Sequence, residues 1–262
     1  MVEPHIPSLA PEILFHLGPF PITNTIINAW IALFIFLGFG LIVRKRFAVR
    51  PGNFQNGMEY FLDTLLSYFD QVTGDRAKTM RFLPLAGSVF FFILLSNWLG
   101  LLPGTGSITV GHTFLLRPAN TDLNLTLAMA LVTVVSSHIF GFLTVGFFTH
   151  INKFIQLGSL VKSLRKGPIG IFRGLVEFAV GLIEIVSEAS KVLSLSLRLF
   201  GNIFAGEVLI TVITSIVAVV VPTPFMLLEL LVGLIQASVF AILALVYMTV
   251  ASSEPHGDEE HH

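Results

Sequence analysis

Two things are scarce in this sequence: cysteine, which is absent, and charge, which only 12% of its 262 residues carry. The lack of cysteine excludes disulfides, thiol catalysis and cysteine-based metal sites. A soluble domain carries about 25% charged residues, whereas this chain is 54% hydrophobic and has a mean hydropathy of +0.84. A soluble fold of this length could not bury so much apolar surface, so the main solvent of this protein must be the lipid bilayer.

Several functional motifs are also missing. There is no His-Glu-x-x-His pair of an intramembrane metalloprotease and no glycine-rich phosphate loop ending in Gly-Lys-Ser or Gly-Lys-Thr. Residues 1–21 lack the basic start of a signal peptide. The acidic, histidine-rich end of the chain resembles a metal site, but a tail beyond the last helix is more typical of disorder. We therefore expect no metal and no cofactor.

Long apolar runs predict an all-α polytopic membrane protein with about five crossings, because a helix needs about 20 apolar residues to span the hydrocarbon core. The runs are too continuous for the alternating strands of a barrel. Residues 53–71 differ: apolar side chains recur there at helical spacing, which predicts an amphipathic helix on the membrane surface or on a partner. The predicted spans cover residues 26–43, 82–102, 123–149, 170–219 and 225–251.

This pattern divides the chain into four parts. Residues 1–25 form an N-terminal extracytoplasmic segment, 26–81 the first span and the surface helix, 82–251 an ion-translocating helical domain, and 252–262 an acidic cytoplasmic tail. A long helical hairpin covers residues 169–251, and its first helix, about 75 Å long at 1.5 Å per residue, must tilt steeply or begin along the membrane surface. Folding the hairpin evenly about residues 221–224 sets Gln236 level with Glu207.

The basic residues predict the orientation. Of the 15 Lys and Arg, 12 lie in three places, at residues 44–50, 76–81 and 153–173, which five crossings put on one side. The positive-inside rule makes this side and the C-terminus cytoplasmic, and puts the N-terminus and the loop at residues 104–120 outside. Arg117 is the only basic residue in an outer loop.

The charges of the long helix are the candidates for function, because a charge near the bilayer centre costs at least ~2.5 kcal/mol. Arg198 lies in a stripe of polar residues at steps of three or four, and small residues, which let another helix approach closely, flank that stripe. Glu207 is nine residues further on and points to the opposite face, while Glu229 and Gln236 share a face of the last helix. The stripe comprises the polar residues Glu184, Glu188, Lys191, Arg198 and Asn202 together with Leu195, and the small residues are Ser187, Ser194, Gly201 and Ala205.

Glu207 and Glu229 thus lie on the outer half of the hairpin, Glu184 and Glu188 on the inner half, and Arg198 between them. This layout is expected of two offset half-channels separated by a barrier. Arginine suits a barrier because it does not lose its proton, and buried carboxyl groups can exchange protons near neutral pH.

Structural roles remain open for three of these residues. Arg198 could form an ion pair with a glutamate of its own bundle, Lys191 could neutralise Glu188 three residues earlier, and His138 could make a hydrogen bond between helices.

Residues 194–207, Ser-Leu-Ser-Leu-Arg-Leu-Phe-Gly-Asn-Ile-Phe-Ala-Gly-Glu, closely resemble the signature of subunit a of rotary F-type ATP synthases. Residues 97–103 (Asn-Trp-Leu-Gly-Leu-Leu-Pro), 122–127 (Asp-Leu-Asn-Leu-Thr-Leu) and 236–240 (Gln-Ala-Ser-Val-Phe) extend the resemblance to about residues 80–251. The resemblance implies two aqueous half-channels beside a rotating ring of c subunits, with an arginine that faces the essential carboxylate of the ring.

The resemblance also implies a role for each candidate residue by its position. Arg198 is the arginine facing the ring, with Asn202 at the same interface and with Ser194, Gly201 and Ala205 beside it. The proton path is lined by Glu207 and Glu229 on the outer side, by Gln236 from the last helix, and by Glu184 and Glu188 on the inner side.

The partners implied are the c-subunit ring, b-type peripheral stalk subunits, the rest of the F-type ATP synthase and membrane lipid, in a bacterial-type plasma membrane and without nucleic acid. The chain alone is not expected to be an enzyme, since the ATP chemistry lies on other subunits. The alternative function is a proton-coupled secondary transporter. Transporters usually contain inverted repeats, and the front and back halves of this chain show no such correspondence.

Overall fold

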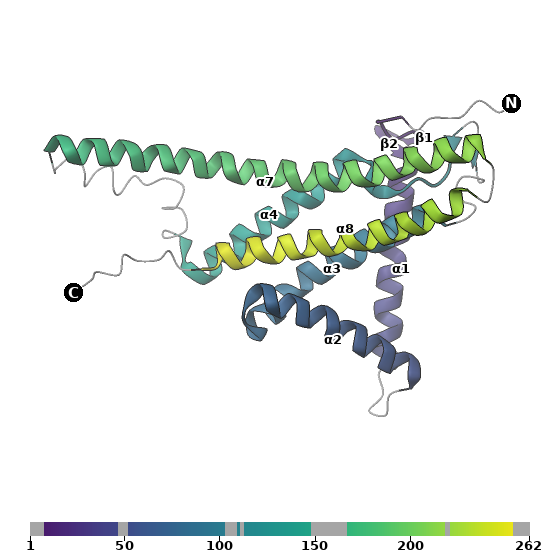
Figure 1. Cartoon of the computed structure of the whole chain (residues 1–262), viewed down its shortest axis with the longest axis horizontal. Coiled ribbons are helices and arrows are strands. Elements are labelled where there is room, and N and C mark those ends of the chain that lie inside the picture. The colour runs from purple at the N-terminus through teal and green to yellow at the C-terminus, as the bar shows by residue number, and fades with distance from the viewer. Residues whose placement is uncertain are drawn as a thin grey trace.

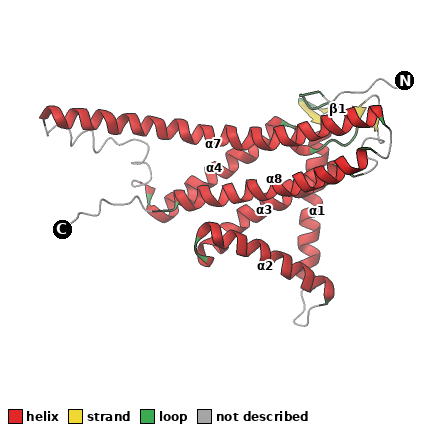
Figure 2. Ribbon diagram, in the orientation of Figure 1, coloured by secondary structure: helices red, strands yellow, loops and turns green. Residues whose placement is uncertain are grey.

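The computed structural model describes residues 8–46, 52–102, 109–110, 113–147, 167–217 and 221–253. Within these residues the chain is almost entirely helical (Figure 2), and five helices are long and apolar enough to cross a membrane. They are α1 (Asn24–Arg46), α3 (Arg76–Gly100), α4 (Leu123–Val145), α7 (Gly167–Ile216) and α8 (Pro222–Ala251). The all-α polytopic membrane fold is confirmed. The basic loop at residues 153–166, much of the outer loop and the acidic tail lie outside the described residues.

Contacts between helix ends show that the five helices alternate in direction. Near the start of α1, the Asn28 side chain donates to the carbonyl of Arg117, 2.7 Å away, in the loop before α4. Near the end of α3, Trp98 donates to the carbonyl of Leu230 in the first turns of α8, at 3.1 Å. Arg117 also pairs with Glu207, near the end of α7. These ends therefore share one side, and the basic stretches at residues 44–46 and 76–81 fall at the opposite ends.

The amphipathic helix predicted at residues 53–71 is confirmed as α2 (Asn53–Thr73). It contacts α3 and α8 of its own chain. The Phe61 ring lies 6.4 Å from that of Phe90 and 6.3 Å from that of Phe91, between ring centroids. Phe69 is buried in the core, whereas Tyr60, on the other face, is 77% exposed.

The start of α3 differs from the prediction. Helix α2 ends at Gly74, whose φ of 69° is the left-handed conformation that glycine adopts readily. Asp75 then caps α3 by accepting a hydrogen bond from the backbone N–H of Ala77 at 3.0 Å. The helix therefore starts at Arg76, six residues before the predicted start of the span at residue 82, and Pro84 lies inside it.

Short elements at the helix ends on the side of Arg117 were not predicted. Strands β1 (Ile13–Leu17) and β2 (Phe20–Thr23) pair antiparallel and lead directly into α1. Strands β3 (Thr109–Val110) and β4 (Thr113–Phe114) form a second small pair, followed by the 3-10 turn η1 (Ala119–Thr121). Asp122 caps α4 by accepting a hydrogen bond from the backbone N–H of Asn124 at 2.9 Å.

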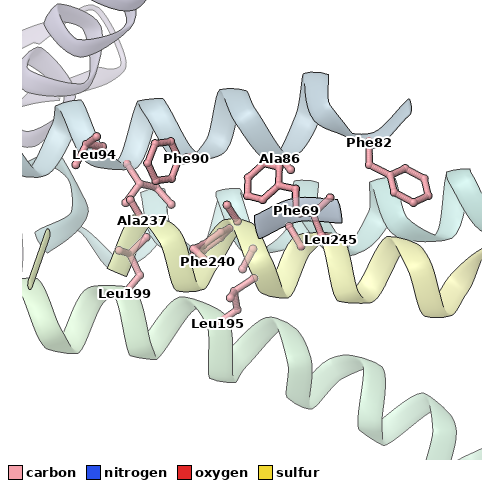
Figure 3. Packing of buried hydrophobic residues seen from close by; sticks show 14 of the residues in the cluster. Phe69, Phe82, Ala86, Phe90, Leu94, Leu195, Leu199, Ala237, Phe240 and Leu245 are labelled. Carbon is pink, nitrogen blue, oxygen red and sulfur yellow. The ribbon is translucent and has the colours of Figure 1, made fainter. Parts of the chain in front are cut away.

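One apolar core joins α3, α4, α7 and α8, with Phe69 of α2 at its edge (Figure 3). Phe82, Ala86 and Phe90 of α3 and Leu195 and Leu199 of α7 meet the apolar face of α8. That face carries three fully buried alanines, which let neighbouring helices approach closely. They are Ala237, Ala241 and Ala244.

The long hairpin runs across the first span. Helix α1 has 23 residues, about 35 Å, which fits a hydrocarbon core of about 30 Å. Helix α7 has 50 residues, about 75 Å, and lies with α8 across the direction of α1 (Figure 1). With α1 upright in a membrane, α7 and α8 are steeply tilted, as the length of the predicted helix required.

Candidate ion-translocation site

The register of the hairpin brings two polar side chains together next to Arg198. Asn202 of α7 donates a hydrogen bond to Gln236 of α8, with 2.8 Å between Nδ2 and Oε1. The expectation that Gln236 lies level with Glu207 was wrong, because it assumed a turn centred on residues 221–224. Helix α7 ends at Ile216 and α8 already begins at Pro222, since proline is well tolerated in the first turn of a helix. The turn thus comes earlier, and Gln236 moves toward Arg198.

Arg198 is exposed and unpaired. It lies on the outer surface of α7, and no residue in the described part of the chain forms an ion pair or hydrogen bond with it. None of its three possible internal partners pairs with it: Glu207 pairs with Arg117, Glu188 pairs with Lys191, and Glu184 makes no ion pair with any described residue. A structural ion pair within the described residues is therefore excluded for Arg198.

The described residues of this chain leave the surface beside Arg198 uncovered. Ser194 and Ala205 are exposed, and a methyl group added to Gly201 would meet no atom within 4 Å. Leu193 and Leu197 on the same helix are 55% and 53% exposed. A charged side chain thus stands among small and apolar residues on a face that can receive another helix.

Glu207 occupies the opposite face of α7, as its spacing from Arg198 predicted. Its two carboxylate oxygens accept hydrogen bonds from Arg117: Nε lies 2.8 and 3.0 Å from Oε1 and Oε2, and Nη2 lies 2.8 Å from Oε2. Arg117 is only 5% exposed and also donates to the carbonyl of Ser8 at 2.9 Å. This is a buried, bidentate ion pair of the strong kind.

Glu229 has a different environment, although it lies on the same outer half. It is 6% exposed, and its Oε1 atom has no hydrogen-bond partner among the described residues. Its carboxyl group rests against the backbone of α7 at Gly206, where any Cβ atom would overlap it. The glycine at position 206 is therefore required for this close approach.

The inner half of the hairpin holds a cluster of three polar residues from two helices. Glu188 accepts from Lys191 at 2.5 Å and lies 3.4 Å from Nε2 of His138 on α4. The Lys191 ammonium lies 5.4 Å from the ring centroid of Tyr247 on α8, within range of a cation–π contact. Lys191 thus neutralises Glu188, and His138 contacts Glu188 across two helices, so both residues make the structural contacts that the sequence left open. Glu184 is partly exposed, with no partner among the described residues.

The other motifs of the resemblance hold the hairpin in place. Asn97 of α3 donates to the carbonyl of Gly233 at 3.4 Å and accepts from Asn120 at 2.7 Å. Thr126 of α4 and Ser196 of α7 lie within hydrogen-bond distance, 3.1 Å apart. These buried polar contacts fix α3, α4 and the loop before α4 against α7 and α8.

Sequence reasoning missed the role of Arg117. Arg117 stands out in the sequence as the one basic residue of a predicted outer loop, but this isolation served only to predict the orientation of the chain. Its partner is 90 residues away in sequence. Among the described residues, no group of three His, Cys, Asp or Glu side chains is close enough to hold a metal ion.

Comparison with known proteins identifies the family of this chain. Residues 26–249 match the family described as ATP synthase A chain. The chain is 31% identical to an ATP synthase subunit a of Moorella thermoacetica over 91% of its own length and 94% of that protein. It is 32% identical to a Gloeobacter violaceus subunit a over 96% and 92% of the two chains. A chloroplastic subunit a of Stigeoclonium helveticum is 33% identical over 89% and 86%. The chain belongs to the ATP synthase A chain family.

Proposed function

We propose that this chain is the stator ion-channel subunit in the membrane sector of a rotary F-type ATP synthase. In that role it passes protons through two offset half-channels to and from a carboxylate on the c-subunit ring, and so couples proton flow to ATP synthesis. Residues 82–251 form the ion-translocating part. Membership in the family favours this function over a proton-coupled secondary transporter.

The observation that carries the proposal is the unpaired charge of Arg198. A charge in a membrane helix is costly unless it is paired, and here the described residues offer no partner on the exposed face of α7. The partner is therefore expected on another chain. A carboxylate on a helix that packs against Ser194, Gly201 and Ala205 fits both the charge and the small side chains.

The charge also gives the barrier its chemistry. At an effective dielectric constant of 20, two unit charges 4 Å apart attract by about 4 kcal/mol before desolvation. A ring carboxyl group arriving beside Arg198 would release its proton and take up another on leaving. Asn202 and Gln236, which are hydrogen-bonded to each other about one turn from Arg198, line the path by which the ring carboxyl group approaches it.

The two paths lie on either side of this barrier. Glu207 and Glu229 line the outer path, and Glu184 and Glu188 line the inner path. The partners of the subunit are the c-ring, b-type peripheral stalk subunits, the remaining subunits of the synthase and membrane lipid. The N-terminus lies outside a bacterial-type plasma membrane and the C-terminus in the cytoplasm. The subunit needs no cofactor and performs no ATP chemistry itself.

The test is substitution of Arg198 in the assembled complex. Arg198→Ala should abolish proton-driven ATP synthesis and raise passive proton leak, because nothing then separates the half-channels. Arg198→Lys should fail nearly as badly, since a buried lysine can lose its proton and lacks the planar fork of arginine. ATP synthesis and passive proton flux are measured in vesicles, with subunit assembly checked in parallel.

Leu37→Ala in α1 is the control, because it trims an exposed apolar side chain on another helix without touching a charge or the face beside Arg198. It should synthesise ATP at close to the wild-type rate. Substantial synthesis by a fully assembled Arg198→Ala complex would remove Arg198 from the mechanism.

A further inference from the structure

The two carboxylates of the outer path differ in their surroundings, and this difference assigns them different tasks. We propose that Arg117 is a positioning residue that holds Glu207 as a permanent anion, so that Glu229 alone exchanges protons in the outer path. The inference rests on the proposed function, because it divides the work within the path described there.

The contacts of Glu207 favour its ionised form. Both of its oxygens accept hydrogen bonds from the guanidinium of Arg117, through three contacts of 2.8 to 3.0 Å. The two side chains are 6% and 15% exposed. Protonating Glu207 would weaken these charge-assisted hydrogen bonds, and Arg117 cannot compensate because it does not give up its own proton.

The charge of Arg117 depends on Glu207. Its remaining contacts are neutral: the carbonyls of Ser8 at 2.9 Å and Ala10 at 3.3 Å, and the ring of Phe204, whose centroid lies 5.9 Å from Cζ. Protonating Glu207 would leave a buried cation without a counter-ion, which is strongly unfavourable. Two other carboxylates of this region accept hydrogen bonds from neutral groups: Glu12 from the Asn24 amide at 3.5 Å and Asp122 from the Thr25 hydroxyl at 3.2 Å.

Arg117 also joins three separate segments at this point. Arg117 lies in the loop before α4, and its guanidinium donates hydrogen bonds to the backbone carbonyls of Ser8 and Ala10 and to Glu207 of α7. Its own carbonyl accepts a hydrogen bond from Asn28 of α1. A proton carrier must be free to change its charge and its contacts. A group on which three segments depend is suited to a fixed charge.

Glu229 has the properties that Glu207 lacks. It is buried against Gly206, and its Oε1 has no partner among the described residues. It lies seven residues before Gln236 on the same face of α8, and Gln236 also has a buried amide nitrogen, Nε2, without a partner in the described part of the chain. Two unsatisfied polar groups along one helix face indicate a route that water or a proton donor can fill.

The experiment compares one single and one double substitution in the whole complex. Glu207→Gln leaves Arg117 uncompensated and should reduce ATP-driven proton pumping by roughly tenfold or more. Arg117→Met with Glu207→Leu replaces the pair by apolar side chains of similar volume, an exchange that buried ion pairs often tolerate. Although this double variant has no carboxylate at position 207, it should recover most of the lost pumping. Glu229→Gln should stop pumping in either background.

A second measurement leaves the ion pair intact and does not depend on the assembly of the double variant. Glu229→His replaces the exchanging carboxyl group by an imidazole. Burial favours the neutral form of both groups, which lowers the pKa of an imidazole but raises that of a carboxyl group, so the pH dependence of proton flux should shift to lower pH. The double variant at positions 117 and 207 should keep the wild-type pH dependence. A purely structural role of Glu229 would not move the profile.

The outcomes separate the inference from the proposed function. An assembled double variant that pumps as slowly as Glu207→Gln, or an unchanged pH dependence in Glu229→His, overturns the division of roles while the outer path remains. Wild-type pumping by both Glu229→Gln and Arg198→Ala would instead remove the proton path from this hairpin altogether.

Discussion

Gly206 provides a direct test of where the Glu229 carboxyl group must lie. An alanine Cβ at position 206 would overlap the carboxyl carbon and both oxygens of Glu229. Since carbon atoms pack at about 3.5 Å or more, the carboxyl group would have to withdraw by more than about 1 Å. A displacement of about 1 Å can cost roughly 100-fold in rate. Gly206→Ala should therefore reduce proton flux by one to two orders of magnitude.

The effect on folding should be much smaller. Alanine is favoured over glycine in a helix by about 1 kcal/mol, whereas an overpacked core position costs about 1–3 kcal/mol. The net loss is therefore at most about 2 kcal/mol. Gly40→Ala, in α1, has open space around its new methyl group and serves as the matched control for both measurements.

The assay is ATP-driven proton pumping in vesicles, with the amount of assembled complex and its thermal unfolding midpoint measured on the same preparation. We expect normal assembly, a small change in the midpoint and a large loss of pumping for Gly206→Ala. If that variant pumped like the Gly40→Ala control while Glu229→Gln was inactive, the position of the Glu229 carboxyl group would not matter, and the reasoning would be refuted.

Three further predictions concern the face beside Arg198, the buried contacts of Asn97 and the orientation of the chain in the membrane. A methyl group added by Gly201→Ala meets no described atom within 4 Å, so the variant should leave the isolated subunit as stable as before but slow ATP synthesis by the assembled complex. Equal rates of synthesis by the variant and wild-type complexes would argue against a partner helix at this face. Asn97→Ala leaves buried amide groups unsatisfied and should destabilise the subunit by about 1–3 kcal/mol, seen as a lower unfolding midpoint, whereas the exposed Asn124→Ala should change it little. Cysteines at Ser107 and Ser163 should react with an impermeant thiol reagent only from the outside and only from the cytoplasm, respectively; the reverse pattern would invert the orientation.

The features that the sequence could predict are those set by the membrane itself. The spans were visible because a helix in lipid must be long, continuous and apolar. The amphipathic helix α2 could be predicted because Phe61, Phe69 and other apolar residues recur at helical spacing, which places them on one face that must pack against a surface. The opposite orientation of Arg198 and Glu207 followed from helical geometry alone, since both lie on one unbroken helix. Each of these properties is local in sequence.

The features that could not be predicted depend on which segments meet. His138 and Glu188, or Arg117 and Glu207, are far apart in the chain, and nothing in their local pattern names the partner. The hairpin register failed for a related reason: the proline at position 222 was taken as part of a break, whereas it opens α8. Moving the centre of the turn by a few residues changes which side chains of α7 and α8 face each other, and only the packed helices fix that choice.

The charges of the hairpin divide according to whether the chain supplies a counter-ion. Glu188 has Lys191 and Glu207 has Arg117, so these charges cost little to keep in place. Arg198 and Glu229 have no such partner among the described residues, although folding could have supplied one as it did for the others. Arg198 points outward from α7, where none of the described residues neutralises it, and Glu229 points into the bundle, where water or a bound proton must satisfy it. We infer that the unpaired charges are the ones that act during translocation, because a group that must change its partner cannot also be locked to one.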